Sequence, residues 1–425
     1  MTNTLSKLSI NLKKIVFLNL CLLVSFVCNS QTVERDSENI KTVILKPNAV
    51  NFYAPIVRLD EPLNLSFDDL NANEQDYTYK IEHCDIDWSP SELRDSEVVD
   101  GYVEDRIRDY ENSFNTLQPF THYELRIPNE NTKLKISGNY KIYVYNEDME
   151  LAFQRKFVVY ETKTTVGVSI HRSRDLSNIE TNQSVEFIVN NPNFRINNPK
   201  QELFPVILQN NNWDTAISGL KPQFFRGTQL IYKYNKETSF LAGNEFLYFD
   251  SKSIRNSTLN IARVELEDDL YHSYLYTNDE RIDNPYTLFP DVNGNFIVRN
   301  LDSDENHLDA DYSWVHFSLK SRENLDGKDV YISGNYNNWQ LNELNKLDYN
   351  ESLGLFEKSI LMKQGFYNYQ YVTKNEKGDI SNSDIDGSFY LTENDYTVIL
   401  YYKKYGSRYT RIIGVGFGNS KKIHN

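Results

Sequence analysis

Apolar and polar residues alternate along many short segments of this chain, and this two-residue period constrains the fold more than any other feature. Residues 77–81 (YTYKI) and 140–145 (YKIYVY) are clear examples. Successive side chains of a β-strand point to opposite faces, so this period predicts strands. The 30 Tyr and 23 Phe residues favour strands as well, because aromatic side chains fit a pleated, half-buried surface. The sequence therefore predicts an all-β protein.

Polar joints divide the predicted strands into three groups, each with the size and the turn-separated short strands of an immunoglobulin-like β-sandwich. We expect three such sandwiches in tandem after an exported leader, with an acidic linker before the third and a basic tail after it. A calcium loop is the alternative for the acidic segment, although its ligand spacing fits no EF-hand. The predicted ranges are 40–160 (N-terminal sandwich), 161–300 (middle sandwich), 301–311 (linker), 312–404 (third sandwich) and 405–425 (tail).

Residues 1–30 have the order of a secretory signal peptide. A positively charged start is followed by an almost wholly apolar run, residues 15–27, and then by small residues up to a predicted cleavage after Ser30. The apolar run is shorter than the roughly twenty residues that span a bilayer. A short buried helix and lipid attachment at Cys21 or Cys28 are the alternatives, but neither cysteine follows a small residue.

Cleavage would leave Cys84 as the one cysteine of the mature chain, so its stability must come from packed cores and not from disulfides. No later segment is long and apolar enough to span a membrane. We therefore expect a periplasmic or surface protein that is not membrane-spanning.

The net charge of −15 argues against nucleic acid as a partner, because binding to phosphates needs a basic surface. The end of the chain is different, since no acidic residue follows Tyr396. This basic tail is a candidate partner-contacting segment, and a solvated terminus is the alternative. Its candidate contact residues are Arg408, Arg411, Lys421 and Lys422.

Motifs that would indicate catalysis or a bound cofactor are missing from the sequence. It has no nucleophile elbow, Walker loop or dinucleotide fingerprint, and no two histidines stand at metal-ligand spacing. Residues 83–88 (HCDIDW) are the richest cluster, but His83 and Cys84 would point to opposite sides of a strand. We predict a protein that is not an enzyme and needs no cofactor, metal or small-molecule substrate.

The third group carries a recognisable signature. Residues 330–339 (VYISGNYNNW) and 365–372 (GFYNYQYV) resemble the early-set immunoglobulin-like modules of glycogen-binding and starch-branching proteins. Such modules stack sugars on aromatic platforms, typically two tryptophans. Trp339 matches the first one, whereas the loop 373–379 has no aromatic residue for the second. Trp339 is therefore either a glycan-stacking residue or a packing residue of the fold.

The whole chain also resembles a family of Bacteroidetes envelope proteins. Residues 79–91 (YKIEHCDIDWSPS) and 138–145 (GNYKIYVY), followed by a middle β-domain and the early-set module, resemble the plug proteins of the type IX secretion system. The resemblance implies a periplasmic protein that associates with the outer-membrane β-barrel translocon and blocks its channel. The candidate signature residues are His83, Asp85, Asp87 and Trp88.

The leading hypothesis is therefore a non-enzymatic periplasmic plug, held at the outer membrane by its protein partner, the translocon barrel. The alternative is a carbohydrate-binding envelope protein that uses the early-set module. A third possibility is a glycan-active enzyme, although no acidic residue can be singled out for it.

Overall fold

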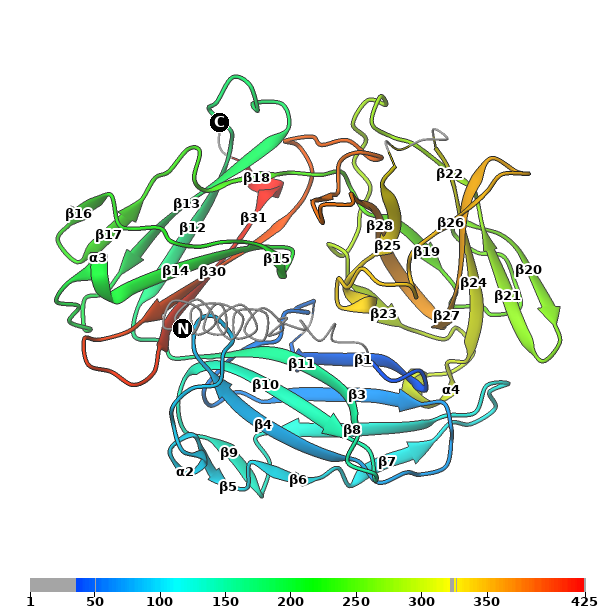
Figure 1. Cartoon of the computed structure of the whole chain (residues 1–425), viewed down its shortest axis with the longest axis horizontal. Coiled ribbons are helices and arrows are strands. Elements are labelled where there is room, and N and C mark those ends of the chain that lie inside the picture. Colours follow the sequence, from blue (N-terminus) through cyan, green and yellow to red (C-terminus); the bar gives the residue numbers. More distant parts are fainter. Residues whose placement is uncertain (1–35, 50, 322–324, 326, 424–425) are drawn as a thin grey trace, which may run out of the picture. The chain divides into compact units, whose positions relative to one another are not determined.

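The computed structural model describes residues 36–49, 51–321, 325 and 327–423, and it consists of packed β-sheets joined by loops (Figure 1). Strands hold 48% of the residues and helices 4%, which confirms the all-β class. The predicted signal peptide lies outside the described residues. No helix in the part of the chain that is described is long and apolar enough to cross a bilayer.

The first sandwich encloses one apolar core between two sheets. Strand β10 illustrates how the sequence dictates it, since Tyr140, Ile142 and Val144 alternate along the strand and are fully buried in that core. The short helix α2 (Asp95–Val98) and the ribbon β5–β9 (Val99–Gly101, Thr132–Leu134) lie beside the sheets. The sheets are β1–β3–β8–β7 (Ile40–Pro47, Leu63–Asp69, Thr121–Ile127, Asp109–Asn112) and β2–β11–β10–β4–β6 (Ile56–Arg58, Leu151–Tyr160, Gly138–Tyr145, Thr78–Cys84, Glu104–Arg106).

The middle sandwich takes two of its strands from the end of the chain. Strand β30 pairs along the full length of β14, from Leu203 opposite Tyr402 to Gln209 opposite Tyr396, and β31 pairs with β30. The short helix α3 (Pro199–Glu202) precedes β14. The sheets are β12–β13–β17–β16 (Thr165–Arg172, Asn182–Asn190, Gln229–Tyr232, Phe224–Arg226), with β18 (Ser239–Leu241) also on β13, and β15–β14–β30–β31 (Asn212–Ile217, Leu203–Gln209, Asp395–Tyr402, Arg411–Asn419).

The third sandwich begins earlier than the sequence predicts, because β19 pairs with β28. The segment 301–311 is not a linker between domains, since it joins β23 to β24 within this sandwich and contains helix α4 (Asn306–Asp309). The sheets are β19–β28–β23 (Leu247–Asp250, Gly365–Lys374, Phe296–Val298), with β25 (Asp329–Ser333) and β29 (Ile380–Ser381) on β28, and β20–β21–β24–β27–β26 (Ile261–Glu267, Leu270–Leu275, Tyr312–Lys320, Leu355–Lys363, Asp348–Asn350), with β22 (Asn278–Asp279) on β24.

The sandwiches are therefore not in tandem: the third one is inserted into the middle one, between β18 and β30. The range 405–425 is not a tail either, because it holds β31 and the short helix η2 (Ser420–Lys422). The glycine-rich pattern of β31 has a packing reason. A Cβ atom on Gly416 would lie 2.4 Å from the carbonyl oxygen of Val166 on β12, so only glycine permits this close approach of the two sheets.

The inserted arrangement predicts which part of the chain can be removed. Gly243 and Thr392 lie side by side, with the Thr392 hydroxyl 2.8 Å from the Gly243 carbonyl. A chain of residues 36–243 joined to 392–423 by a short glycine linker keeps both sheets of the middle sandwich. We expect it to unfold cooperatively in urea and to give a dispersed amide NMR spectrum. A chain of residues 36–300 keeps the first sandwich but lacks β30 and β31, so its amide signals from residues 165–243 should not be dispersed. Dispersed signals from residues 165–243 in the second chain but not in the first would refute the insertion.

Candidate functional site

The first sandwich contacts each of the other two through a buried junction, and one of these junctions holds most of the residues that the sequence singles out. The hairpin junction joins the first sandwich to the hairpin β30–β31 of the middle sandwich. The ion junction joins it to the third sandwich around Asp68 and Lys363.

An apolar cluster forms the base of the hairpin junction. Side chains of β2 and β11 pack against β14, β30 and β31, and all seven central residues are at most 5% exposed. Tyr401 extends from β30 into the first sandwich, where its hydroxyl donates to the buried Asn139 side-chain oxygen at 2.7 Å. The seven residues are Ile56, Val158, Val206, Leu208, Ile399, Tyr401 and Ile412.

The turn after β4 places Trp88 at this junction. The Trp88 backbone has a φ of 64°, a left-handed conformation that is unusual for a large side chain. Asp87 stabilises the turn by accepting hydrogen bonds from the amide (3.1 Å) and the hydroxyl (2.5 Å) of Ser89. These hydrogen bonds hold the pKa of Asp87 below its usual value. Trp88 consequently packs edge-to-face on Trp213 of β15, with ring centroids 4.9 Å apart.

Asp85 binds the hairpin directly. Its Oδ1 atom accepts from the backbone amide of Thr410 at 3.1 Å and from the Thr410 hydroxyl at 2.8 Å. Its Oδ2 atom lies 3.4 Å from Nζ of Lys403. A carboxylate from the first sandwich thus satisfies a backbone donor of the middle one, which fixes where the hairpin lies.

His83 is a buried packing residue of the same junction. Its ring lies edge-to-face with Tyr140 and Tyr409, and its Nδ1 atom is 2.8 Å from the Ser91 hydroxyl. Burial lowers the pKa of His83, which favours the neutral ring. Gly138 makes room for it, since a Cβ atom there would lie 2.1 Å from Nε2 of His83. The two signature segments thus form one structural unit.

Cys84, the neighbour of His83, is buried and carries a free thiol. Burial raises the pKa of this thiol to about 12, so it is protonated at neutral pH. The cluster that is richest in reactive residue types therefore contains no activated nucleophile.

The candidate tail cations are engaged inside the protein. Arg411 forms a two-pronged ion pair with Glu161, with distances of 3.0 and 2.7 Å, and Arg408 pairs with Glu97. Lys421 lies 2.7 Å from Glu393. The side chain of Lys422 lies outside the described residues. The structure thus brings Arg408 and Arg411 to the hairpin junction, near the signature residues.

A buried ionic network forms the ion junction. Asp68 on β3 accepts from Nζ of Lys363 at 2.7 Å and from the Tyr312 hydroxyl at 2.6 Å, and it lies 2.6 Å from Nδ1 of His122. Asp68 and Lys363 are each 1% exposed. Nζ of Lys363 also lies 3.9 Å from the centre of the Phe120 ring. Charges from two sandwiches are therefore desolvated together and satisfy each other.

The network shifts the pKa values of its members in opposite directions. Burial alone would raise the pKa of Asp68, but the charge of Lys363 and the hydrogen bond with His122 lower it below its usual value. Burial would lower the pKa of His122, but its hydrogen bond with Asp68 and the Glu124 carboxylate, 3.5 Å from Nε2, raise it. Burial lowers the pKa of Lys363, and Asp68 opposes this effect. The arrangement thus favours an ionised Asp68 next to a protonated His122.

The acidic segment 301–311 strengthens this junction and holds no metal-ligand group. Asp311 accepts from the backbone amides of Leu117 and Gln118, at 2.6 and 3.1 Å, in the first sandwich. No group of three or more His, Cys, Asp or Glu side chains that could hold a metal is found among the residues that the structure describes.

Trp339 does not form an exposed platform. Its side chain is 8% exposed and packs near Phe246, with ring centroids 6.0 Å apart, and against Gly294. Stacking a sugar needs one free face of the ring, so this geometry favours packing as the role of Trp339.

A histidine cluster, like the network around Asp68, could not be predicted from the sequence. On the sheet that contains β21 and β24, Nδ1 of His272 lies 2.8 Å from Nε2 of His316, and Nδ1 of His316 lies 2.7 Å from the Ser359 hydroxyl. Tyr274 stacks on His316 at 4.2 Å. The two histidines are 44 residues apart and meet across parallel strands, so no sequence spacing could reveal them.

Comparison with known proteins assigns the chain to a family. Residues 40–161 match the family model described as the first domain of the type 9 secretion system plug protein. A crystal structure of a protein from Parabacteroides merdae ATCC 43184 is 32% identical, with a TM-score of 0.87, over 90% of this chain and 98% of that chain. This match supports a role related to the type IX secretion system and an association with the cell envelope. It belongs to the plug protein family of that system.

Two further comparisons add nothing to the assignment. The BSP domain of a biofilm-associated protein aligns at 7% identity over 91% of this chain and 60% of that chain, and its TM-score of 0.14 carries no structural argument. No curated protein matches the sequence.

Replacing Gly138 with alanine tests the unit formed by the two signature segments. We expect Gly138→Ala to lower the free energy of unfolding by about 1–3 kcal/mol, because the new methyl group overlaps His83 in a filled core. The double variant Gly138→Ala/His83→Ala should lose less free energy of unfolding than the sum of the losses in the two single variants. Urea denaturation measures all three variants, and strictly additive costs would show that Gly138 and His83 are not coupled.

The ion junction predicts a pH-dependent contribution to stability. Because the folded-state pKa of His122 is raised, its contribution should be complete below the ordinary value of 6.5 and should disappear as the pH rises through the higher folded-state value. The difference in unfolding free energy between the wild type and His122→Gln should therefore shrink as the pH rises above 6.5. Denaturation curves from pH 6 to 9 measure it, and a constant difference would contradict the pairing.

Proposed function

We propose that this chain is a non-enzymatic periplasmic plug that binds the outer-membrane barrel of the type IX translocon and closes its channel sterically. Membership of the plug family supports a role of this chain in the type IX secretion system. The observation that carries the mechanism is the pair of buried junctions. A body that blocks a pore must not bend at its domain boundaries, and both junctions replace flexible linkers with packed contacts.

The state of the reactive side chains agrees with this mechanism. Cys84 is protonated, His83 is held in a packed site, and Asp85 has hydrogen-bonding partners in the hairpin. These residues therefore stabilise the hairpin junction. A steric block needs a complementary surface and no covalent step.

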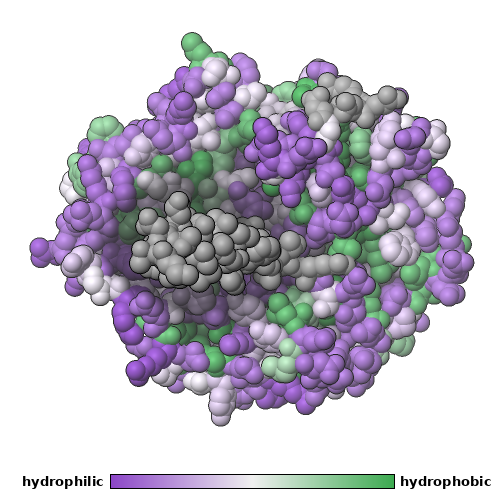
Figure 2. All heavy atoms as spheres, viewed as in Figure 1, coloured by the Kyte–Doolittle hydropathy of each residue, from purple (hydrophilic) through white to green (hydrophobic). Residues whose placement is uncertain are grey.

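The tip of the β30–β31 hairpin is the part of the basic segment that we propose as the partner contact. Tyr405 is 97% exposed, and the neighbouring Lys404 is exposed and forms no ion pair within the described residues. Arg408, Arg411 and Lys421 instead hold the hairpin and its end in place. On an acidic protein, an aromatic side chain beside a free cation suits an acidic patch of a partner. Hydrophilic residues cover most of the face seen in Figure 2.

Affinity purification tests both parts of the proposal. An epitope-tagged chain expressed in its own host should recover a large outer-membrane barrel from solubilised membranes. Lys404→Glu with Tyr405→Ser should reduce recovery about tenfold, because one exposed aromatic contact and one charge are lost. The matched control is Lys133→Glu with Tyr102→Ser, which changes an exposed lysine and tyrosine of the first sandwich.

The outcomes separate the two statements. If the wild type recovers no barrel, the plug function is wrong. If the wild type and the Lys404→Glu/Tyr405→Ser variant recover equal amounts, the barrel is bound through another surface. Equal losses in both double variants would indicate a general charge effect and also contradict contact through the hairpin tip.

A further inference from the structure

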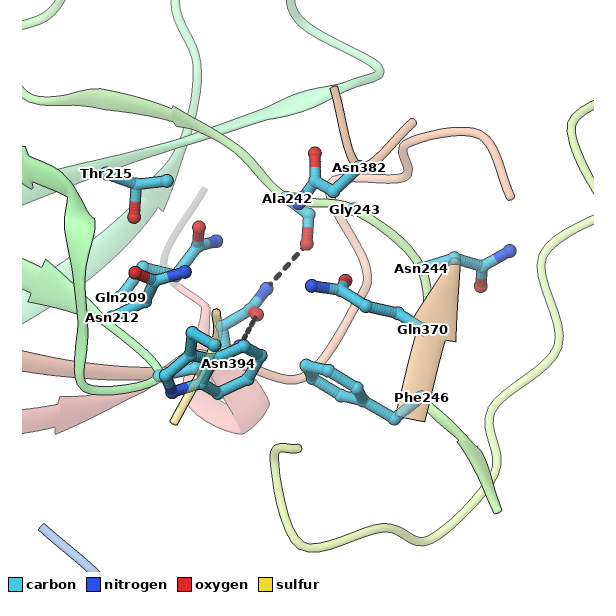
Figure 3. Close-up of a pocket in the computed structure, with 12 residues that line it drawn as sticks. Gln209, Asn212, Thr215, Ala242, Gly243, Asn244, Phe246, Gln370, Asn382 and Asn394 are labelled. Carbon is cyan, nitrogen blue, oxygen red and sulfur yellow. Dashed lines mark hydrogen bonds between the residues drawn. The ribbon is translucent and has the colours of Figure 1, made fainter. Parts of the chain in front are cut away.

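A cleft of about 370 Å³, counting its part open to solvent, lies where the middle and third sandwiches meet (Figure 3). Seven of its twelve lining residues carry side-chain amides, and none is charged. Charged residues make up 25% of the chain, so a wall without any of them is a distinct chemical environment. Such a cleft offers no counter-charge, and it suits a neutral ligand that both donates and accepts hydrogen bonds.

Some of these amides hold the cleft in shape. Asn394 donates to the Ala242 carbonyl at 2.9 Å and accepts from the Asn210 amide at 2.7 Å. Gln209 donates to the Tyr396 hydroxyl at 3.1 Å. These contacts fix the back wall between β14, β18 and β30.

Other amides remain available. Gln370 on β28 and Asn382 after β29 make no side-chain hydrogen bond within the described residues, and the Asn212 side chain uses only its oxygen, as acceptor for the amide of Asp214. Figure 3 shows the Gln370 amide pointing toward the Asn394–Ala242 pair, with Asn382 beside Ala242. Unused donors and acceptors thus face a preformed space.

The cleft also runs along a free sheet edge. Strand β15 ends its sheet, and both Asn212 and Thr215 line the cleft. Residues three apart on a strand point to opposite faces, so the cleft touches the edge of β15, where no further strand pairs with the backbone in the described part of the chain.

We propose that this cleft binds an extended, uncharged peptide segment through its backbone, as an added strand on β15 that is also bound by Gln370 and Asn382. A peptide unit has one donor and one acceptor, as a side-chain amide does. A sugar would instead need an open aromatic face, and Trp339 and Phe246 are 8% and 5% exposed. That the segment belongs to the translocon barrel rests on the proposed function.

Fluorescence anisotropy with the full mature chain tests the cleft. The probe is a labelled, terminally blocked octapeptide of alternating threonine and valine. We expect saturable binding that is lost when alternate backbone nitrogens of the peptide are methylated. Gln370→Ala with Asn382→Ala should weaken binding about tenfold. The control Gln154→Ala, a half-buried glutamine on β11 of the first sandwich, should leave it unchanged.

Several results would overturn the inference: no saturable binding, equal binding of the methylated peptide, or saturable binding of maltoheptaose at the cleft in its place. Barrel purification with the wild type and with the Gln370→Ala/Asn382→Ala variant keeps the test of the cleft separate from the test of the proposed function. Peptide binding without barrel recovery would refute the plug and leave the cleft standing. Barrel recovery without peptide binding would refute the cleft alone.

Discussion

The structure depends on β30, a strand that is buried on both faces. Val398 and Leu400 point into the core of the middle sandwich, whereas Ile399 and Tyr401 point into the hairpin junction with the first. Burying one such side chain contributes about 1.5–3 kcal/mol, against a net stability of about 5–15 kcal/mol for a typical domain. One strand therefore closes a core and anchors a neighbouring sandwich, so the two sandwiches cannot separate without exposing the face that carries Ile399 and Tyr401.

The ion junction acts on the third sandwich in a different way. Removing charges from water costs free energy that their attraction only partly offsets, so the pair of Asp68 and Lys363 adds little net stability. It instead favours one geometry, because any displacement leaves a buried charge without a partner. Packing at one junction and charge at the other give the first sandwich a defined contact with each of its neighbours. Such a defined geometry is what the proposed steric block requires.

Part of this could be predicted from the sequence, because a two-residue period reports that one face of a strand is buried. The period does not show which strands pair with each other. The sequence therefore predicts β30 as a strand of the third sandwich, whereas in the structure it pairs with β14 of the middle one. The same limit applies to side chains. Asp85 and Trp88 stand out in the sequence as a cluster, but their partners Thr410 and Trp213 lie far along the chain. From the sequence alone, Arg411 is expected to be a free cation of the tail. In the structure it forms an ion pair with Glu161.

The central claim is that a non-enzymatic body closes the channel, and channel conductance measures this most directly. The purified translocon barrel without the chain should conduct ions in a planar lipid bilayer. Addition of the purified chain to the periplasmic side should reduce the conductance toward the bilayer baseline, in proportion to the fraction bound. An unchanged conductance at saturating binding would show that the chain docks on the translocon without sealing it, and would contradict the account.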